Sequence, residues 1–256
     1  MEEALVLIDE LTPEQIASIC DHTYLAAFEA FGKQAAEGMN PIRLRAQGLR
    51  FFLETAVESE LVPYLLCVRS EHVSSVVGYL GERGRTDMRV AAAICFPEGS
   101  VETEFKVSET RLAIARGATE VDVVLNYDRL KAGDTQYARD DARAVADAAH
   151  ENNVLMKLIL ETSELSKDQI RQACELADEI GADFVKTSTV LPPGATAENL
   201  RIMRENFSRG VKMSGGAAGN PERVRGLLLA ASGRTDGYID LSPSKVRIGG
   251  ELLTAL

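Results

Sequence analysis

The sequence contains no tryptophan, few aromatic residues (5%), three histidines and four cysteines. The cysteines, Cys20, Cys67, Cys95 and Cys174, are scattered without a C-x-x-C pair, which is typical of free thiols in a reducing compartment. The histidines are equally dispersed, so no zinc-ligand spacing is present. We therefore expect a cytoplasmic protein that uses no metal or other cofactor.

Long apolar runs are also missing. None approaches the length of a membrane span, and the acidic start M-E-E-A does not resemble a signal peptide. Basic residues are outnumbered, and the net charge of −11 argues against a general nucleic-acid or anionic-membrane binder. With 45% hydrophobic and 26% charged residues, the chain can bury a sizeable core. We expect a small-molecule partner, and no nucleic-acid or membrane partner.

Nucleotide-binding and serine-hydrolase motifs are absent as well. No G-x-G-x-x-G follows the first predicted strand, and neither a P-loop nor G-x-S-x-G occurs. The glycines of G-Y-L-G-E-R-G (78–84) have a different spacing and follow a predicted helix. We interpret this segment as a turn.

Short apolar runs alternate with amphipathic segments along the whole chain. The runs are almost continuously apolar, as expected of parallel strands covered on both faces. The predicted strands are 19–23, 61–68, 88–96, 120–126, 154–160, 184–189, 211–215 and 245–249. The predicted helices include 101–116, 139–152, 167–180, 197–206 and 221–231. Eight such units with no dividing linker favour a closed (β/α)8 TIM barrel, formed by residues 1–256 as a single domain.

Two lysines near the ends of consecutive predicted strands give the strongest functional signal: Lys186 in F-V-K-T-S-T and Lys212 in G-V-K-M-S-G-G. Lysine is costly in a buried strand, and an amine attacks a carbonyl only as the free base. At roughly 6 Å and an effective dielectric of about 20, two ammonium groups repel by about 3 kcal/mol, which favours loss of a proton. The pair predicts a Schiff-base nucleophile and its activating neighbour. Two snorkelling lysines are the alternative.

Two more charged residues belong to the same series of strands. Asp122, Lys157, Lys186 and Lys212 occupy the fourth to the seventh predicted barrel strands. In this architecture such groups face the lumen or lie near the carboxyl ends of the strands, where catalytic groups gather. Asp122 can be a catalytic residue or a structural counter-ion for one lysine. Both interpretations place it in the same cluster.

Other polar residues lie at predicted strand ends. Asp21, at the end of the first strand, is expected to join the same pocket. Glu161 and Asn126 end later strands and can equally cap the helices that follow.

On these motifs the chain resembles the deoxyribose-phosphate aldolase family, the class I aldolases that join acetaldehyde to glyceraldehyde 3-phosphate. The resemblance covers nearly the whole chain. It is carried by D-H-T-Y-L (21–25), G-A-T-E-V-D-V-V-L-N-Y-D-R-L-K-A-G-D (117–134), K-L-I-L-E-T-S-E-L (157–165), G-A-D-F-V-K-T-S-T (181–189) and V-K-M-S-G-G (211–216).

The resemblance implies a role for each residue of the pocket. Lys186 corresponds to the Schiff-base lysine, Lys212 to the neighbour that favours its free base, Asp122 to an acid/base acting through a water, and Lys157 to a support of this relay. The resemblance also implies an aldehyde or sugar substrate and a homo-oligomer, expected to be a dimer. The implied substrate-binding residues are Asp21, Thr23, Cys67, Thr189, Gly215, Gly216, Gly249 and Glu251.

The C-terminal motif R-I-G-G-E-L (247–252) departs from the family's R-I-G-x-S-S, in which serines at a helix N-terminus hold the substrate phosphate. Glu251 and Leu252 replace the serines, and a carboxylate there would repel phosphate. Either the acceptor is unphosphorylated or differently substituted, or Glu251 faces solvent and another cation, such as Arg247, binds the phosphate.

A second departure follows K-T-S-T, where Val190 and Leu191 replace the family's glycine. A barrel that binds ligands without catalysis is a further interpretation. Retention of Asp122, Lys186 and Lys212 together argues against it, because unused buried charges are costly.

Overall fold

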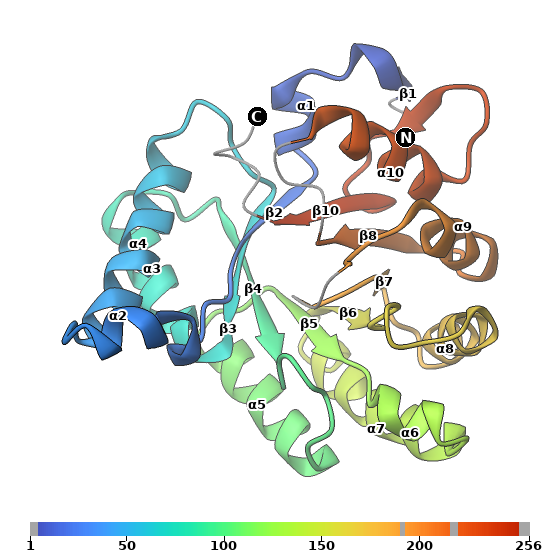
Figure 1. Cartoon of the computed structure of the whole chain (residues 1–256), viewed down its shortest axis with the longest axis horizontal. Helices are drawn as coiled ribbons and strands as arrows, with labels where there is room; N and C mark the ends of the chain where they lie inside the picture. Colours follow the sequence, from blue (N-terminus) through green and yellow to red (C-terminus); the bar gives the residue numbers. More distant parts are fainter. Residues whose placement is uncertain (1–4, 190–192, 216–219, 251–256) are drawn as a thin grey trace.

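Eight parallel strands close into a barrel in the order β10-β2-β3-β4-β5-β6-β7-β8, and helices surround it (Figure 1). The computed structural model describes residues 5–189, 193–215 and 220–250. The barrel strands are β2 (Cys20–Tyr24), β3 (Leu65–Arg69), β4 (Arg89–Ile94), β5 (Glu120–Val124), β6 (Leu155–Ile159), β7 (Phe184–Lys186), β8 (Gly210–Ser214) and β10 (Val246–Gly250). Every predicted strand is confirmed, and so is the (β/α)8 barrel.

Helices cover the outside of the barrel, and most of them begin at a side chain that caps the first turn. They are α1 (Pro13–Ala17), α2 (Gly32–Ala36), α3 (Pro41–Glu58), α4 (Val73–Glu82), α5 (Thr103–Ala115), α6 (Tyr127–Lys131), α7 (Thr135–His150), α8 (Lys167–Glu179), α9 (Ala197–Asn206) and α10 (Pro221–Ser232), with single turns η1 (Ile8–Glu10), η2 (Phe28–Phe31) and η3 (Ser70–His72). A capping box between Ser166 and Gln169 starts α8, and Gly233 in the left-handed conformation (φ 72°) ends α10. The five predicted helices are confirmed.

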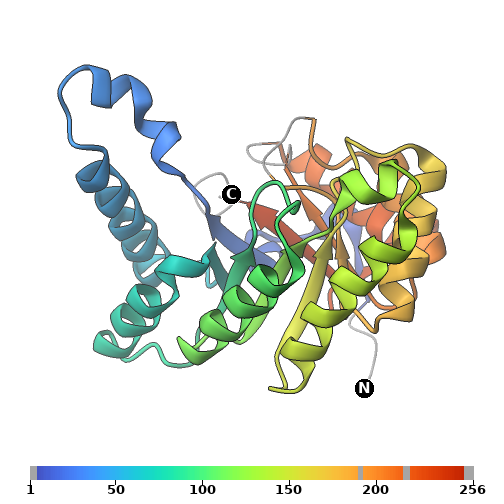
Figure 2. The ribbon, with the colours of Figure 1, turned by 90° about the horizontal axis from the view of Figure 1, so that it is seen from below.

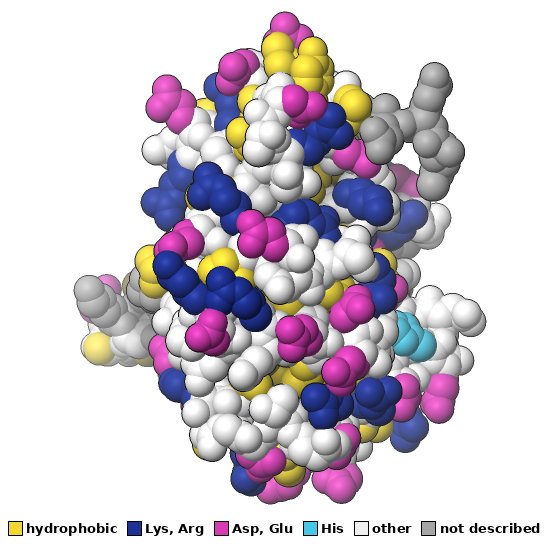
Figure 3. All heavy atoms as spheres, turned by 90° about the vertical axis from the view of Figure 1, so that its right-hand side faces the viewer, with side chains coloured by type: hydrophobic (Ala, Val, Ile, Leu, Met, Phe, Trp, Pro, Cys, Tyr) yellow, Lys and Arg dark blue, Asp and Glu magenta, His cyan; other side chains and the backbone are white. Residues whose placement is uncertain are grey.

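Most of the helices pack an apolar face against the sheet, and the space between strands and helices forms the main core. On the face over α8 and α9, basic and acidic side chains are interspersed (Figure 3). Figure 2 shows α2 and the start of α3 extending away from the barrel. None of the helices within the described ranges is long and apolar enough to cross a membrane.

Two local predictions need correction. The segment 78–84 is not a turn, because α4 continues to Glu82. The buried stripe of Val73, Val76 and Leu80 holds this helix despite its glycines. The sequence also did not indicate the antiparallel pair of β1 (Leu5–Leu7) and β9 (Tyr238–Asp240), because these three-residue strands come from opposite ends of the described chain.

A buried ion pair joins α5 and α7 to the carboxyl end of β5. Lys106 Nζ donates to Asp141 Oδ2 at 2.6 Å and to the carbonyl of Val124 at 3.1 Å, while Thr103 Oγ1 donates to Asp141 Oδ1 at 2.9 Å. Both charged side chains are almost fully buried. This contact fixes two helices beside the strand that carries Asp122.

The change Lys106→Met should lower the free energy of unfolding by about 3–5 kcal/mol, because it leaves the buried Asp141 carboxylate without its cation. The double change Lys106→Met with Asp141→Leu should recover part of the loss. Urea denaturation measures both. The matched control is Arg50→Ala, which breaks the exposed pair with Glu54 and should leave the midpoint nearly unchanged. An equally small effect of Lys106→Met would show that this pair does not hold the helices.

Candidate active site

Seven ionisable side chains meet inside the barrel, and all are buried. Parallel strands place residues in register on the same face, and alternate residues of a strand share that face. Asp122 is in register with Lys157, Lys186 with Lys212, and Lys212 with Arg247. The seven are Asp21, Glu120, Asp122, Lys157, Lys186, Lys212 and Arg247.

The carboxylate of Asp122 is shared by three lysines. Its Oδ2 accepts from Lys186 Nζ at 3.0 Å and from Lys212 Nζ at 2.8 Å, and its Oδ1 accepts from Lys157 Nζ at 2.7 Å. Burial alone would raise the pKa of Asp122, but the three ammonium groups outweigh it and hold the pKa well below its usual value. Asp122 is therefore an anion at neutral pH. Because Lys186 and Lys212 bind the same oxygen, their amines are close neighbours.

Lys157 and Lys212 have further anionic partners. Lys212 Nζ lies 2.5 Å from Asp21 Oδ2, and Lys157 Nζ lies 2.5 Å from Glu120 Oε2 and 3.5 Å from Asp21 Oδ2. Burial would lower the pKa of each lysine, but the carboxylates outweigh it and raise the pKa of both. Lys157 and Lys212 are consequently ammonium ions at neutral pH.

Arg247 closes the lumen beneath the lysines. Its Nη1 donates to Asp21 Oδ1 at 3.2 Å and to Glu120 Oε2 at 2.9 Å, and its Nη2 donates to Glu120 Oε1 at 3.1 Å. The guanidinium carbon lies 4.0 Å from the ring centroid of Tyr64 and 5.0 Å from that of Phe184. From the sequence, Arg247 was one candidate for the cation that binds the substrate phosphate. That interpretation is wrong, because the side chain is buried and committed to Asp21 and Glu120.

The charges of the cluster do not balance. Four cationic side chains, the three lysines and Arg247, face three carboxylates within the described residues. Among the lysines, Lys186 has the fewest anionic contacts, a single one to Asp122 that it shares. A buried positive charge without its own counter-ion is unfavourable. Lys186 is thus the least compensated lysine of the cluster.

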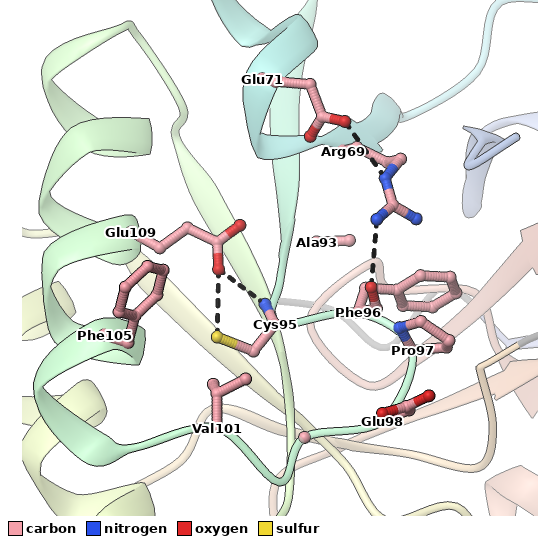
Figure 4. Close-up of a pocket in the computed structure, with 11 residues that line it drawn as sticks. Arg69, Glu71, Ala93, Cys95, Phe96, Pro97, Glu98, Val101, Phe105 and Glu109 are labelled. Atoms are coloured by element: carbon pink, nitrogen blue, oxygen red, sulfur yellow. Dashed lines mark hydrogen bonds and ion pairs between the residues drawn. The ribbon is translucent and has the colours of Figure 1, made fainter. Parts of the chain in front are cut away.

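A pocket of about 240 Å³ opens at the carboxyl end of β4 (Figure 4). Ala93 in its wall is in register with Asp122. Glu109 accepts from the backbone N–H of Cys95 at 2.9 Å and from its Sγ at 3.1 Å. Burial and this carboxylate raise the pKa of the Cys95 thiol, so it remains a protonated donor.

Carboxylates outnumber cations around this pocket. Glu71, Glu98 and Glu109 line it, whereas Arg69 is its one cationic lining residue among those described. Arg69 already donates to the carbonyl of Phe96 and to Glu71. The pocket therefore suits an uncharged group better than a phosphate.

Comparisons with known proteins agree with this geometry. A model of the DeoC/LacD family of aldolases matches residues 53–232. The chain belongs to this family. It is 44% identical over 156 residues to a deoxyribose-phosphate aldolase of Thermococcus gammatolerans, covering 60% of this chain and 69% of the relative. It is 37% identical over 206 residues to that of Clostridium perfringens, covering 79% and 83%.

Solved structures give the same result. A Coccidioides immitis protein described as a candidate deoxyribose-phosphate aldolase has a TM-score of 0.74 and 32% identity, over 94% of this chain and 84% of its own. The deoxyribose phosphate aldolase of Aeropyrum pernix, described as tetrameric, has a TM-score of 0.70 at 22% identity, over 97% and 92%. The second likeness supports the fold alone. The family resemblance seen in the sequence motifs is confirmed, and the protein is an aldolase-family enzyme, a lyase.

Three further predicted site residues of this aldolase-family chain, Cys67, Thr23 and Gly249, contact residues of the cluster. Cys67 Sγ is 3.9 Å from Asp122 Oδ2, and burial, with a contribution from Asp122, raises the pKa of its thiol to about 11. Thr23 Oγ1 donates to the carbonyl of Asp21 at 2.7 Å. A Cβ at Gly249 would lie 2.9 Å from Lys212 Cε, so a larger residue there would require Lys212 to shift. Gly215 has φ 79° and packs against Gly194.

Three positions that the sequence analysis singled out, Gly216, Glu251 and Leu252, lie outside the described residues. Two residues of the cluster were not predicted. Glu120 and Arg247 belong to the cluster without having been assigned to it. The only sequence signal was a charged residue in an apolar strand, the signal that singled out the lysines. Within the described ranges, no group of three His, Cys, Asp or Glu is arranged to hold a metal.

His22 lies next to Asp21 but on the outer face of β2. Its ring stacks on Phe52 with centroids 4.6 Å apart, and its Nδ1 is buried with no hydrogen-bond partner among the described residues. Burial lowers the pKa of His22 to about 4, although a hydrogen bond with the backbone of Gly250 opposes the shift. The folded protein therefore holds His22 neutral.

This burial should make stability depend on pH. Between the unfolded pKa of about 6.5 and the folded pKa of about 4, the unfolded chain binds the proton more readily, so stability falls as pH falls. From pH 7.5 to pH 5 the loss due to His22 should be about 2 kcal/mol. Urea denaturation of His22→Phe, which keeps a stacking ring, should show a pH dependence weaker by that amount. Parallel pH profiles of wild type and variant would contradict the assignment.

Proposed function

We propose that the protein is a class I aldolase of the deoxyribose-phosphate aldolase type, which adds an acetaldehyde-like donor to a second aldehyde through a Schiff base. The observation that carries the proposal is the charge excess at Asp122. Lys157 and Lys212 are held as cations by their carboxylates, whereas Lys186 has only the shared contact with Asp122, so we assign Lys186 as the nucleophile. A buried free amine beside a carboxylate is the arrangement that Schiff-base chemistry needs.

The reaction follows from these positions. The Lys186 amine attacks the donor carbonyl, and the carbinolamine loses water to form an iminium ion. Asp122, which lies 3.0 Å from Lys186 Nζ, exchanges the protons through a water, while Lys157 and Lys212 hold its carboxylate in place. Loss of a proton from the adjacent carbon gives an enamine, which attacks the acceptor aldehyde. Hydrolysis of the resulting iminium returns the β-hydroxy aldehyde and the free lysine.

Borohydride should trap acetaldehyde on Lys186, and Lys186→Ala should abolish both trapping and turnover, because Lys157 and Lys212, the other lysines of the cluster, are each paired with more than one carboxylate. Peptide mass spectrometry identifies the modified residue. The matched control is Lys131→Ala, which removes an exposed lysine paired with Glu164. This variant should form the acetaldehyde adduct as wild type does. A non-catalytic binding barrel predicts no adduct, and an adduct on Lys212 alone would reverse the assignment.

A specific observation favours an unphosphorylated or differently substituted acceptor. Glu251 and Leu252 replace the serines that hold phosphate in the family. The pocket at β4 adds three glutamates and only one arginine, which is already engaged. Both features disfavour a dianion and permit an uncharged hydroxyaldehyde.

The preference for glyceraldehyde 3-phosphate over glyceraldehyde should therefore be weaker than in the family by roughly two orders of magnitude. The hydrogen bonds from the two serine hydroxyls to the phosphate are lost, and the carboxylate of Glu251 repels the phosphate. The double change Glu251→Ser with Leu252→Ser should restore it. Parallel kcat/KM measurements on the two acceptors decide the matter. A strong preference for the phosphorylated acceptor in the unmodified protein would instead support the ordinary deoxyribose-phosphate aldolase reaction.

Three further expectations belong to this proposal: residues 1–256 form one domain, the protein is a homodimer, and it acts in the cytoplasm. The free thiols support the cytoplasm, the closed barrel supports the single domain, and the dimer rests on the family resemblance alone. Sedimentation equilibrium tests the dimer, and a monomer or tetramer mass would contradict it.

A further inference from the structure

The amino half of the barrel lumen holds an ion pair where this fold usually packs branched apolar side chains. Glu120, at the start of β5, and Arg247, near the start of β10, are 3% and 1% exposed. The guanidinium binds the carboxylate with two hydrogen bonds, from Nη1 to Oε2 at 2.9 Å and from Nη2 to Oε1 at 3.1 Å. This Glu120–Arg247 pair lies directly beneath the three lysines.

The surroundings hold Arg247 in one orientation. Its guanidinium lies between the rings of Tyr64 and Phe184, and its Nε donates to the carbonyl of Pro243 at 2.6 Å. A Cβ at Gly210 would lie 2.2 Å from the ring of Phe184, so a larger residue there would displace the ring. The two rings and the carbonyl thus direct the guanidinium toward the lumen.

Stability alone is a weak reason for such a pair. Removing two charges from water costs free energy that their attraction often fails to recover, and apolar side chains of similar size are often as stabilising or more so. The contacts that each member makes outside the pair supply another reason.

Glu120 supports the lysine that holds the catalytic carboxylate. Its Oε2 lies 2.5 Å from Lys157 Nζ, and Lys157 Nζ donates to Asp122 Oδ1 at 2.7 Å. The bidentate contact with Arg247 fixes the position of the Glu120 carboxylate. One continuous chain of contacts therefore leads from Arg247 to Asp122.

Arg247 also supports a second chain of contacts, through Asp21. Its Nη1 lies 3.2 Å from Asp21 Oδ1, while Asp21 Oδ2 lies 2.5 Å from Lys212 Nζ. Lys212 Nζ donates to Asp122 Oδ2 at 2.8 Å. Both oxygens of Asp122 are thus held, through a lysine, by groups that the Glu120–Arg247 pair fixes from below.

We propose that Glu120 and Arg247 are positioning residues of the aldolase reaction, acting through Lys157 and Asp21 on the carboxylate of Asp122. The inference rests on the proposed function. The pair is neutral as a whole, so its removal disturbs the geometry of the cluster, whereas removal of one member also changes the charge beside Lys186.

The test is the pH dependence of borohydride trapping of acetaldehyde at Lys186. For Arg247→Met we expect the midpoint to move to higher pH by about one unit, because the cluster loses a cation. For Glu120→Gln we expect it to move to lower pH by about one unit, because the cluster loses an anion. Arg247→Lys keeps the charge and should keep the midpoint of wild type.

The double variant Glu120→Gln with Arg247→Met separates position from charge. Its midpoint should return to that of wild type, because one cation and one anion are lost together. Its trapping rate on the pH plateau should still fall about tenfold, because Lys157 and Asp21 lose the contacts that direct them. Thermal melting should show it at least as stable as either single variant, because no buried charge is left without its partner.

The matched control is Lys106→Gln, which breaks a buried ion pair outside the lumen. It should lower the melting temperature and leave both the midpoint and the plateau rate of trapping unchanged. If Arg247→Met does not fold, Glu120→Gln and Arg247→Lys still carry the test, one with a lowered midpoint and the other with an unchanged midpoint.

Three outcomes would overturn the inference. Unchanged midpoints in both Arg247→Met and Glu120→Gln would show a structural role only, and shifts in the same direction would show a general loss of packing. A wild-type plateau rate in the double variant would show that the pair positions nothing. Failure of the proposed function is distinct, because wild type itself would then form no acetaldehyde adduct at any pH.

Discussion

The sharing of one carboxylate, that of Asp122, by three lysines is the interaction on which the rest of this structure depends. Three buried lysines without an anion would be costly to enclose, and without their charges burial would raise the pKa of Asp122. The closed barrel makes the arrangement possible, because it directs side chains from neighbouring strands into one small lumen. The basic side chains still exceed the carboxylates by one among the described residues, and Lys186 is the least compensated lysine.

Structural support and chemistry occupy different parts of the same barrel. Arg247, stacked between Tyr64 and Phe184, fills the lumen on the amino side of the lysines and holds Asp21 and Glu120. The strand ends on the other side carry the segment after Lys186 and the pocket at β4. This division follows the general rule for such barrels, in which the carboxyl ends of the strands bear the catalytic groups.

The sequence was sufficient for the barrel and for most of the cluster because both leave strong local signals. Parallel strands buried on both faces appear as short apolar runs, and a lysine such as Lys186 in such a run is conspicuous. Glu120 and Arg247 carry the same signal but stand near strand starts, where a charge usually means a solvated end. Glu161 could not be assigned, because Thr189, whose N–H and hydroxyl donate to its carboxylate, is distant in the chain and its backbone conformation leaves no trace in the sequence. The strands β1 and β9 are too short for any pattern.

The central claim is that charge excess, set by Lys212, keeps Lys186 in its reactive form. The most direct measurement is the pH dependence of borohydride trapping at Lys186 in wild type and in Lys212→Met. Without Lys212, three basic side chains face three carboxylates, so the cluster is neutral when Lys186 carries its proton. The midpoint for adduct formation should therefore move to higher pH by about one unit or more. An unchanged midpoint in a folded variant would contradict the account, and would assign the reactivity of Lys186 to burial alone.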